Sequence, residues 1–368
     1  MAFRFSTHLK QLPPWYNIRG LEFGVVLGTM GRLVRNLKGE VFPGWSTKES
    51  RARVAATLTP VVRSMAGFKQ ASHAAMPELD KEERKLLLER KQITPCLAAR
   101  QDGSHVFINK KQDTIIMLNE EEHLAIHRFA SGNQLDTIVA DLRKKAKHVE
   151  SQADMAYSKE YGYLTSMASE CGDGLQLYMV LHLPGHVILN QIDKVERALN
   201  KLHLNISPFY TEYGEETGNL YVLFSPPAPL GTTDEILKHM EATADSLTEK
   251  ELLLRQKIAA EDTITLSDAI GRMYGTLQHG AIMRYPELLH TVSMIRIATE
   301  TGFLLFNGDP SHLQARLADI MLISSPTHLS YTSEEKSETI QAFMRMHLMK
   351  NLAAHLHIND EFSLHILP

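Results

Sequence analysis

Apolar positions recur at helical spacing in the first quarter of the chain. In residues 50–68, an apolar residue returns every three or four positions, the period that places side chains on one side of a helix. Residues 78–93 are highly charged with a single apolar edge, which is typical of an exposed helix. We therefore expect residues 1–95 to form a small helical N-terminal domain.

The pattern changes after about residue 96, where alternating and continuous apolar runs predict strands. Residues 105–109 and 114–118 flank the polar segment KKQD, which indicates a β-hairpin with a short loop. Residues 175–183 place five apolar side chains on one face of a strand, because successive side chains alternate between the two faces. Further strands are expected at residues 202–210 and 219–225.

Helical patterns follow these strands. Thr232 and Glu235 form a capping box that begins a long helix. Pro286 and Gly302 mark the start and the end of another helix. Strands joined by hairpin-like links and followed by helices predict an α+β fold. We expect residues 96–368 to form a larger domain with a mainly antiparallel β-sheet flanked by helices.

Composition narrows the class of protein. A chain of 368 residues exceeds what one core usually fills, so about two domains are expected. The net charge of −4 argues against a nucleic-acid binder held by bulk electrostatics. No apolar run is long enough for a membrane span, and the N-terminus lacks the apolar core of a signal peptide. These features predict a cytoplasmic protein with no nucleic-acid partner and no membrane span.

Metal and thiol chemistry are weakly indicated. Cys96 and Cys171 are the chain's two cysteines, so there is no disulfide framework and no paired thiolate site. His355, His357 and His365 near the C-terminus lack a closed set of ligands and favour a histidine-rich surface. We therefore expect no metal site built from protein ligands alone.

Two acidic clusters are the main candidates for chemistry. The segment NEEEHLAI at residues 119–126 follows a predicted strand directly, and YTEYGEETGN at residues 210–219 follows another. Carboxylates at the ends of sheet strands can orient a cationic substrate and take its proton. Solvated turns would give the same pattern, so the residues alone leave both interpretations open.

Several segments, in unbroken order, resemble the ATP:guanidino phosphotransferase (phosphagen kinase) family, and most closely its bacterial protein-arginine kinase branch, McsB. They are VVLGTMGRLVRNLKG at residues 25–39, IMLNEEEHLAI at 116–126, YGYLTSMASECGDGLQLYMVLHLPG at 161–185 and SPFYTEYGEETGNLYVLFS at 207–225. The resemblance implies a small helical N-terminal domain and a larger antiparallel-sheet domain. It also implies transfer of the γ-phosphate of Mg-ATP to a guanidinium nitrogen.

The resemblance assigns roles to particular positions. Glu121 matches the carboxylate that binds the guanidinium group, and Glu212 and Glu215 match a pair of glutamates that includes the second catalytic carboxylate. The family's nucleotide-binding positions fall, mostly with substitutions, on Gly28, Thr29, Met30, Gly31, Arg32, Lys91, Ala125, Gln176 and Ser207.

The substitutions concentrate on the phosphate-binding arginines. Arg32 is kept, whereas Met30, Ala125, Gln176 and Ser207 stand where the family has arginine. Guanidinium groups bind phosphate oxygens bidentately, and phosphoryl transfer depends mainly on such charge stabilisation. The sequence therefore predicts that Mg-ATP binding is weakened or lost. One alternative is that Arg35, Arg100 or Arg128 supplies the missing charge.

A second family motif is also altered. The phosphoarginine-binding motif of the McsB branch falls on residues 336–341, where Lys336, Ser337 and Ile340 replace its arginines and aspartate. The favoured hypothesis is a degenerate McsB-like pseudokinase that acts as a binding or regulatory scaffold in protein quality control. The alternatives are an active protein-arginine kinase with a remodelled nucleotide site and a small-molecule phosphagen kinase.

The resemblance also implies partners. They are a McsA-like zinc-finger protein, Clp-type machinery, an arginine-containing protein substrate if the chain is active, and a second copy of the chain in a homodimer.

Overall fold

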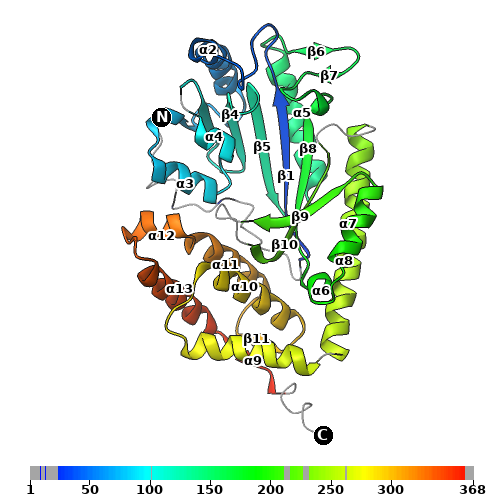
Figure 1. Cartoon of the computed structure of the whole chain (residues 1–368), viewed down its shortest axis with the longest axis vertical. Helices are drawn as coiled ribbons and strands as arrows, with labels where there is room; N and C mark the ends of the chain where they lie inside the picture. The colour runs from blue at the N-terminus through cyan, green and yellow to red at the C-terminus, as the bar shows by residue number, and fades with distance from the viewer. Residues whose placement is uncertain are drawn as a thin grey trace.

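The computed structural model describes Leu9, Pro13 and residues 24–100, 102–210, 216–226, 232–261 and 263–360. Its centre is an eight-stranded sheet in the order β2-β3-β4-β5-β1-β8-β10-β9, in which every neighbouring pair is antiparallel (Figure 1). The strands are β1 Val26–Arg35, β2 Ser72–Ala75, β3 His105–Ile108, β4 Thr114–Leu118, β5 Leu124–Ser131, β8 Leu175–His182, β9 Asn205–Tyr210 and β10 Glu216–Phe224. The predicted α+β class with an antiparallel sheet is confirmed.

The strand β1 corrects the expectation that the first 95 residues are helical. It lies in the middle of the sheet, between β5 and β8, and pairs with both. A Cβ on Gly31 would lie 2.5 Å from Leu142 and 2.6 Å from Ile138, so glycine at this position allows helix α5 (Leu135–Glu150) to approach the strand. Strand pairing on both sides decides the conformation here, and local periodicity does not reveal it. The division into domains 1–95 and 96–368 stays a prediction.

The predicted strands and helix caps of the remaining chain are confirmed. β3 and β4 form the expected hairpin, and β8 alternates buried and half-buried side chains over most of its length. In the capping box, the backbone N–H of Thr232 donates to Glu235 at 2.7 Å and the backbone N–H of Glu235 donates to Oγ1 of Thr232 at 3.3 Å. The helix α8 that follows extends over Thr233–Glu261.

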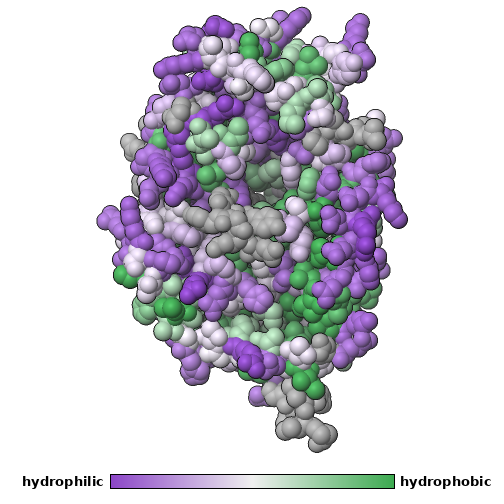
Figure 2. Space-filling view, viewed as in Figure 1, coloured by the Kyte–Doolittle hydropathy of each residue, from purple (hydrophilic) through white to green (hydrophobic). Residues whose placement is uncertain are grey.

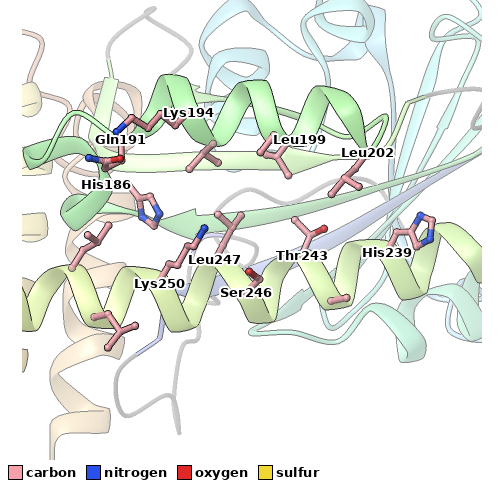
Figure 3. Close-up of a pocket in the computed structure, with 15 residues that line it drawn as sticks. His186, Gln191, Lys194, Leu199, Leu202, His239, Thr243, Ser246, Leu247 and Lys250 are labelled. Carbon is pink, nitrogen blue, oxygen red and sulfur yellow. The ribbon is translucent and has the colours of Figure 1, made fainter.

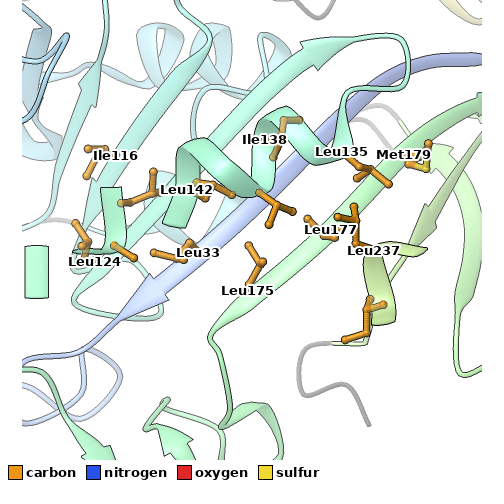
Figure 4. Packing of buried hydrophobic residues seen from close by; sticks show 14 of the residues in the cluster. Leu33, Ile116, Leu124, Leu135, Ile138, Leu142, Leu175, Leu177, Met179 and Leu237 are labelled. Carbon is orange, nitrogen blue, oxygen red and sulfur yellow. The ribbon is translucent and has the colours of Figure 1, made fainter. Parts of the chain in front are cut away.

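Helices cover the two faces of the sheet differently. One face packs against α2 (Lys48–Ser64), α5 and α8, and this interface forms the largest apolar core (Figure 4). On the other face, α3 (Lys81–Glu89) and α4 (Pro95–Ala99) cover only the edge formed by β2, β3, β4 and part of β5. Burying apolar side chains on both faces stabilises the sheet by about 25 cal/mol per Å². The centre of the second face carries no helix from this pair.

The C-terminal helices form a separate layer below the sheet in Figure 1. Helix α10 of this layer packs against β10, and its predicted start and end are confirmed. The elements of this layer are α9 Thr263–His279, α10 Tyr285–Glu300, α11 Pro310–Ile323, α12 Pro326–Ser333, α13 Glu338–Ala353, β11 Leu304–Phe306 and β12 Leu356–Ile358. The helices α6 Pro184–Ile188 and α7 Ile192–Lys201 connect β8 to β9. The short pair β6 Tyr157–Ser158 and β7 Gly162–Tyr163 lies beyond the other end of the sheet (Figure 1). Within the described residues, no helix combines the length and apolarity that crossing a membrane requires.

A buried carboxylate joins α3 to the C-terminal layer. Glu89 is 5% exposed and accepts hydrogen bonds from Oγ of Ser325 at 2.7 Å and from the backbone N–H groups of Thr327 at 2.8 Å and His328 at 3.0 Å. These donors lie at the start of α12, where backbone N–H groups lack partners within the helix. Glu89 therefore caps a helix that is more than two hundred residues away along the chain.

Candidate functional site

Within the described part of the chain, a cavity of about 760 Å³ lies against the centre of the sheet. Strand register explains its lining, because directly paired residues direct their side chains to the same face. Met30 of β1 pairs with Phe129 of β5 and with Tyr178 of β8, and Val222 of β10 pairs with Val180. The lining residues are Gly28, Thr29, Met30, Lys91, Ile93, Thr94, Pro95, His127, Phe129, Gln176, Tyr178, Val180, Ser207, Phe209, Val222 and Phe224.

Most polar groups of this cavity are neutral and engaged. Nε2 of Gln176 donates to the carbonyl of Ser225 at 3.1 Å, while its Oε1 accepts a hydrogen bond from the hydroxyl of Tyr178. Burial raises the pKa of Tyr178 to about 12, so its hydroxyl stays protonated. Nζ of Lys91 lies 4.8 Å from the ring centroid of Phe209, a cation–π contact. Lys91 is the one cationic side chain among the lining residues that the structure describes.

His127 differs from these neighbours. Its side chain is 6% exposed, and its Nε2 has no hydrogen-bond partner among the residues that the structure describes. Burial, with a smaller contribution from Arg32, lowers the pKa of His127 to about 3, so the imidazole is neutral at physiological pH. A buried polar atom without a partner costs about 1–3 kcal/mol.

Residues 119–123 of the acidic segment form the tight connection between β4 and β5. The backbone N–H of Asn119 donates to the carbonyl of His123 at 3.1 Å, and that of Glu120 donates to Glu122 at 3.1 Å. The sequence left open whether these glutamates bind a cationic substrate or form a solvated turn, and neither interpretation describes all three. Glu120 and Glu122 are 2% and 1% exposed, whereas the side chain of Glu121 is 54% exposed.

The two buried carboxylates have structural partners. Oε1 of Glu120 accepts from Oγ1 of Thr94 at 2.5 Å. Oε2 of Glu122 accepts from Nδ2 of Asn36 at 2.5 Å, and its Oε1 accepts from the backbone N–H of Ser166 at 2.9 Å. Glu122 therefore fixes the loop before β8 against the end of β1.

The carboxylate of Glu121 is paired with an arginine of the chain itself. Nη2 of Arg32 lies 3.2 Å from Oε2 of Glu121 and 3.6 Å from Oε2 of Glu120. Burial and the charge of Glu120 raise the pKa of Glu121, while Arg32 opposes that shift. The sulfur of Cys96 belongs to the same group, since ligand atoms of Cys96, Glu120 and Glu121 lie within 4.8 Å of one another.

Comparison with known proteins gives this arrangement a family. The model of the ATP:guanido phosphotransferase C-terminal catalytic domain matches residues 53–254, which is more than half of the chain. The chain belongs to the ATP:guanido phosphotransferase family. A protein-arginine kinase of Halothermothrix orenii is 28% identical over 343 residues, covering 93% of this chain and 96% of the relative. A protein-arginine kinase of Moorella thermoacetica is 29% identical over 300 residues, covering 80% and 85%.

Solved structures show the same fold. The duplicated taurocyamine kinase of Schistosoma mansoni, solved with transition-state analogue components, has a TM-score of 0.58 at 19% identity. That match covers 66% of this chain and 35% of the other, so the chain spans about a third of the duplicated kinase. A lombricine kinase has a TM-score of 0.54 at 17% identity and covers 65% of this chain and 69% of the other.

The structure places the family's nucleotide positions in different surroundings. Gly28, Thr29, Met30, Lys91, Gln176 and Ser207 line the cavity, and their role in nucleotide binding stays a prediction. Gly31 faces α5 on the opposite side of the sheet. Ala125 has 0% exposure and belongs to the apolar core under α3 and α4. Arg32 points to the β4–β5 connection, where it pairs with Glu121 and Glu120.

The arginines considered as substitutes are engaged elsewhere. Nε of Arg35 donates to Glu150 at 2.8 Å, and its guanidinium carbon lies 3.4 Å from the ring centroid of Tyr163. Arg128 pairs with Asp113 at 3.3 Å and with Asp141 at 3.0 Å. Nε of Arg100 donates to the carbonyl of Glu120 at 3.2 Å. None of these arginines lines the cavity in the part of the chain that the structure describes.

The remaining predicted positions are less informative. Glu212 and Glu215 lie outside the described residues. At the motif matched to phosphoarginine binding, the Lys336 side chain is 74% exposed and lies 3.6 Å from Glu82, and Ile340 is 47% exposed. Ser337 is the N-cap residue of α13.

Among the described residues, the cavity lining supplies few cations for the triphosphate that the family uses. A nucleotide triphosphate carries up to about four negative charges, which guanidinium forks neutralise in pairs of hydrogen bonds. The described lining supplies Lys91 and otherwise neutral or apolar groups. The missing arginines are visible in the sequence, but the aromatic lining residues His127, Phe129, Tyr178, Phe209 and Phe224 were not predicted from it. Alternation along the strands was the signal that could have grouped them.

Proposed function

We propose that this chain is a degenerate member of the protein-arginine kinase branch that keeps the kinase fold and serves as a binding or regulatory scaffold. Phosphoryl transfer is weak or absent in this proposal. The main support for this proposal is the ion pair that Arg32 forms with Glu121. The one phosphate-binding arginine retained in the matched motifs pairs with Glu121 at 3.2 Å instead of pointing into the cavity.

The energetic argument follows from the missing cations. A hydrogen bond to a charged group contributes about 1.5–3 kcal/mol. Loss of three such contacts would remove about 4–9 kcal/mol of transition-state stabilisation, a factor of about 10³ to 10⁶ in rate. The lone Lys91 offers a point charge in place of a bidentate fork.

The guanidinium side of the site supports binding without turnover. Glu121 holds a guanidinium group in this structure, but that group belongs to Arg32 of the same chain. A substrate arginine would compete with Arg32 for the exposed carboxylate, and each exposed ion pair contributes only about 0–1 kcal/mol. The site therefore favours a weak, reversible contact with an arginine side chain of a protein.

An active protein-arginine kinase with a remodelled nucleotide site is the second candidate. The observation that favours it is the extent of the similarity, because a protein-arginine kinase covers 93% of this chain. For either candidate, the partners that we propose are a protein ligand, including a McsA-like zinc-finger protein or Clp-type machinery, and a second copy of the chain. We place the protein in the cytoplasm.

Mg-ATP binding separates the two candidates. We expect that millimolar Mg-ATP leaves the melting temperature unchanged, because a ligand at about 100 times its Kd would add about 2.7 kcal/mol of stability. Magnesium alone and ATP with a chelator serve as controls for non-specific salt effects.

A second assay follows phosphoarginine on an arginine-rich model protein incubated with Mg-ATP. We expect no phosphoarginine above the level of a reaction without enzyme. A rise in melting temperature together with clear turnover would refute the scaffold proposal and support the active kinase.

A further inference from the structure

The cavity on the open face of the sheet has the size and lining of a ligand site. Its volume of about 760 Å³ lies within the usual range for small-molecule pockets. Helices α3 and α4 bury the β2–β3–β4 edge of this sheet face, but the central strands beside it stay accessible. Figure 2 shows that polar residues dominate much of the viewed surface, with hydrophobic side chains gathered near α6 and the adjoining part of α8. The described lining of the cavity is mainly apolar and aromatic.

Its walls favour a flat, apolar molecule. Tyr178 and Phe224 are stacked, with ring centroids 6.0 Å apart and an interplanar angle of 22°. Phe129 and Phe209 contribute further rings, and the thioether of Met30 adds a polarizable group. Aromatic rings bind other rings through offset-stacked or edge-to-face contacts, and thioethers make favourable contacts with ring edges.

The charges of the lining exclude most ionic ligands. No carboxylate lines the cavity within the described residues, so a cationic ligand would meet only Lys91. Among the described lining residues, a polyanion would find Lys91 as its single counter-ion, and that ammonium group already lies over the Phe209 ring. An uncharged ligand avoids both desolvation penalties.

One polar atom in the wall lacks a partner. Nε2 of His127 is buried, lies in the cavity lining and forms no hydrogen bond with any described residue. Buried polar atoms are nearly always satisfied by protein, water or ligand. A ligand with a single hydrogen-bonding group opposite Nε2 would satisfy this atom.

We propose that this cavity binds an uncharged, largely aromatic small molecule whose hydrogen-bonding group faces Nε2 of His127. The proposal rests on the proposed function, because it requires that Mg-ATP does not occupy the same space. The remodelled nucleotide site is then a sensor or storage site for an apolar compound within the kinase fold.

The test uses the full chain and the probe N-phenyl-1-naphthylamine, an uncharged aromatic amine whose fluorescence increases in apolar surroundings. We expect saturable binding with one site per chain. Val222→Asp places a carboxylate in the cavity wall and should weaken binding by about tenfold or more. His127→Phe keeps a ring of similar size but removes Nε2, and should weaken binding about 2- to 12-fold.

A control variant lies in a second groove, between α7 and α8 (Figure 3). Leu253 lines that groove and is 58% exposed, so Leu253→Glu adds the same charge at an apolar site elsewhere. We expect it to leave probe binding unchanged. Circular dichroism of each variant verifies that it is folded.

Several results would overturn the proposal. They are the absence of saturable binding, equal binding by Val222→Asp and wild type, loss of binding in Leu253→Glu, and tighter binding of the anionic analogue 1-anilinonaphthalene-8-sulfonate. Displacement of the probe by Mg-ATP would overturn the proposed function as well. Failure of both the probe and Mg-ATP to bind would overturn the ligand proposal alone.

Discussion

Restoring the family's arginine at Ala125 should destabilise the protein. Ala125 has 0% exposure, and its strand neighbours across the sheet are Met117 and Val34. All three belong to the apolar core that α3 and α4 cover. In Ala125→Arg, the longer side chain must enter a packed layer, and its guanidinium group would lie among apolar side chains.

The magnitude follows from these two effects. Overpacking a core costs about 1–3 kcal/mol, and an unpaired buried charge costs several kcal/mol more. We expect Ala125→Arg to lose about 4 kcal/mol or more of a total stability of about 5–15 kcal/mol. The matched control is Met30→Arg, because Met30 lines the open cavity and its substitution leaves the guanidinium in contact with solvent.

Urea denaturation followed by circular dichroism measures both variants. The expected result is a large fall in the unfolding midpoint for Ala125→Arg and a change within about 1 kcal/mol for Met30→Arg. A wild-type midpoint for Ala125→Arg would refute the reasoning, because the guanidinium would then have reached the cavity. If Ala125→Arg kept its wild-type midpoint and also bound Mg-ATP, the added cation alone would be sufficient to restore nucleotide binding.

Glu89→Ala should lower the free energy of unfolding by about 3 kcal/mol or more, because Ser325, Thr327 and His328 lose their hydrogen-bond acceptor. Glu82 lies on the same helix and forms only an exposed ion pair, so Glu82→Ala should change that free energy by less than about 0.5 kcal/mol. Urea titrations measure both variants. The pKa of His127 is about 3 in the folded state and about 6.5 when unfolded, so the unfolded state binds the proton first and stability falls as pH drops from 6.5 toward 3. His127→Phe lacks this titrating group, so its melting temperature relative to wild type should rise as the pH falls from 6.5 toward 3. A difference in melting temperature that does not depend on pH would contradict the lowered pKa of His127. Arg32→Met should cost about 1–3 kcal/mol because it removes the cation beside the buried carboxylate of Glu120. Glu121→Gln should be nearly neutral in the same urea titrations, and equal losses would show that the exposed pair with Glu121 dominates.

The substitutions change one half of the site more than the other. In the connection at residues 119–123, Glu120 and Glu122 are buried and hydrogen-bonded. Its geometry depends on backbone hydrogen bonds and on partners such as Asn36 and Thr94. The positions that the resemblance matches to phosphate binding carry mostly apolar or neutral side chains within an intact antiparallel sheet.

Elements with strong local signals are predictable from the residues alone. The hairpin of β3 and β4, the alternating strand β8, the capping box at Thr232 and the helix after Pro286 have local patterns, and each is present. Motif order was sufficient to place the chain among the guanidino phosphotransferases, because their turns and strand ends keep recognisable residues. The missing arginines were also visible from the sequence alone.

Tertiary structure decided what those positions now contact. Only pairing with β5 and β8 makes residues 26–35 the central strand, since their glycines and mixed polarity have no clear period. Only the packing of α3 and α4 buries Ala125 while Met30 stays open to the cavity. The contact between Arg32 and Glu121 joins residues far apart in the chain, and no local pattern encodes such a pair. Long-range register and burial therefore determine whether a retained residue still faces its ligand.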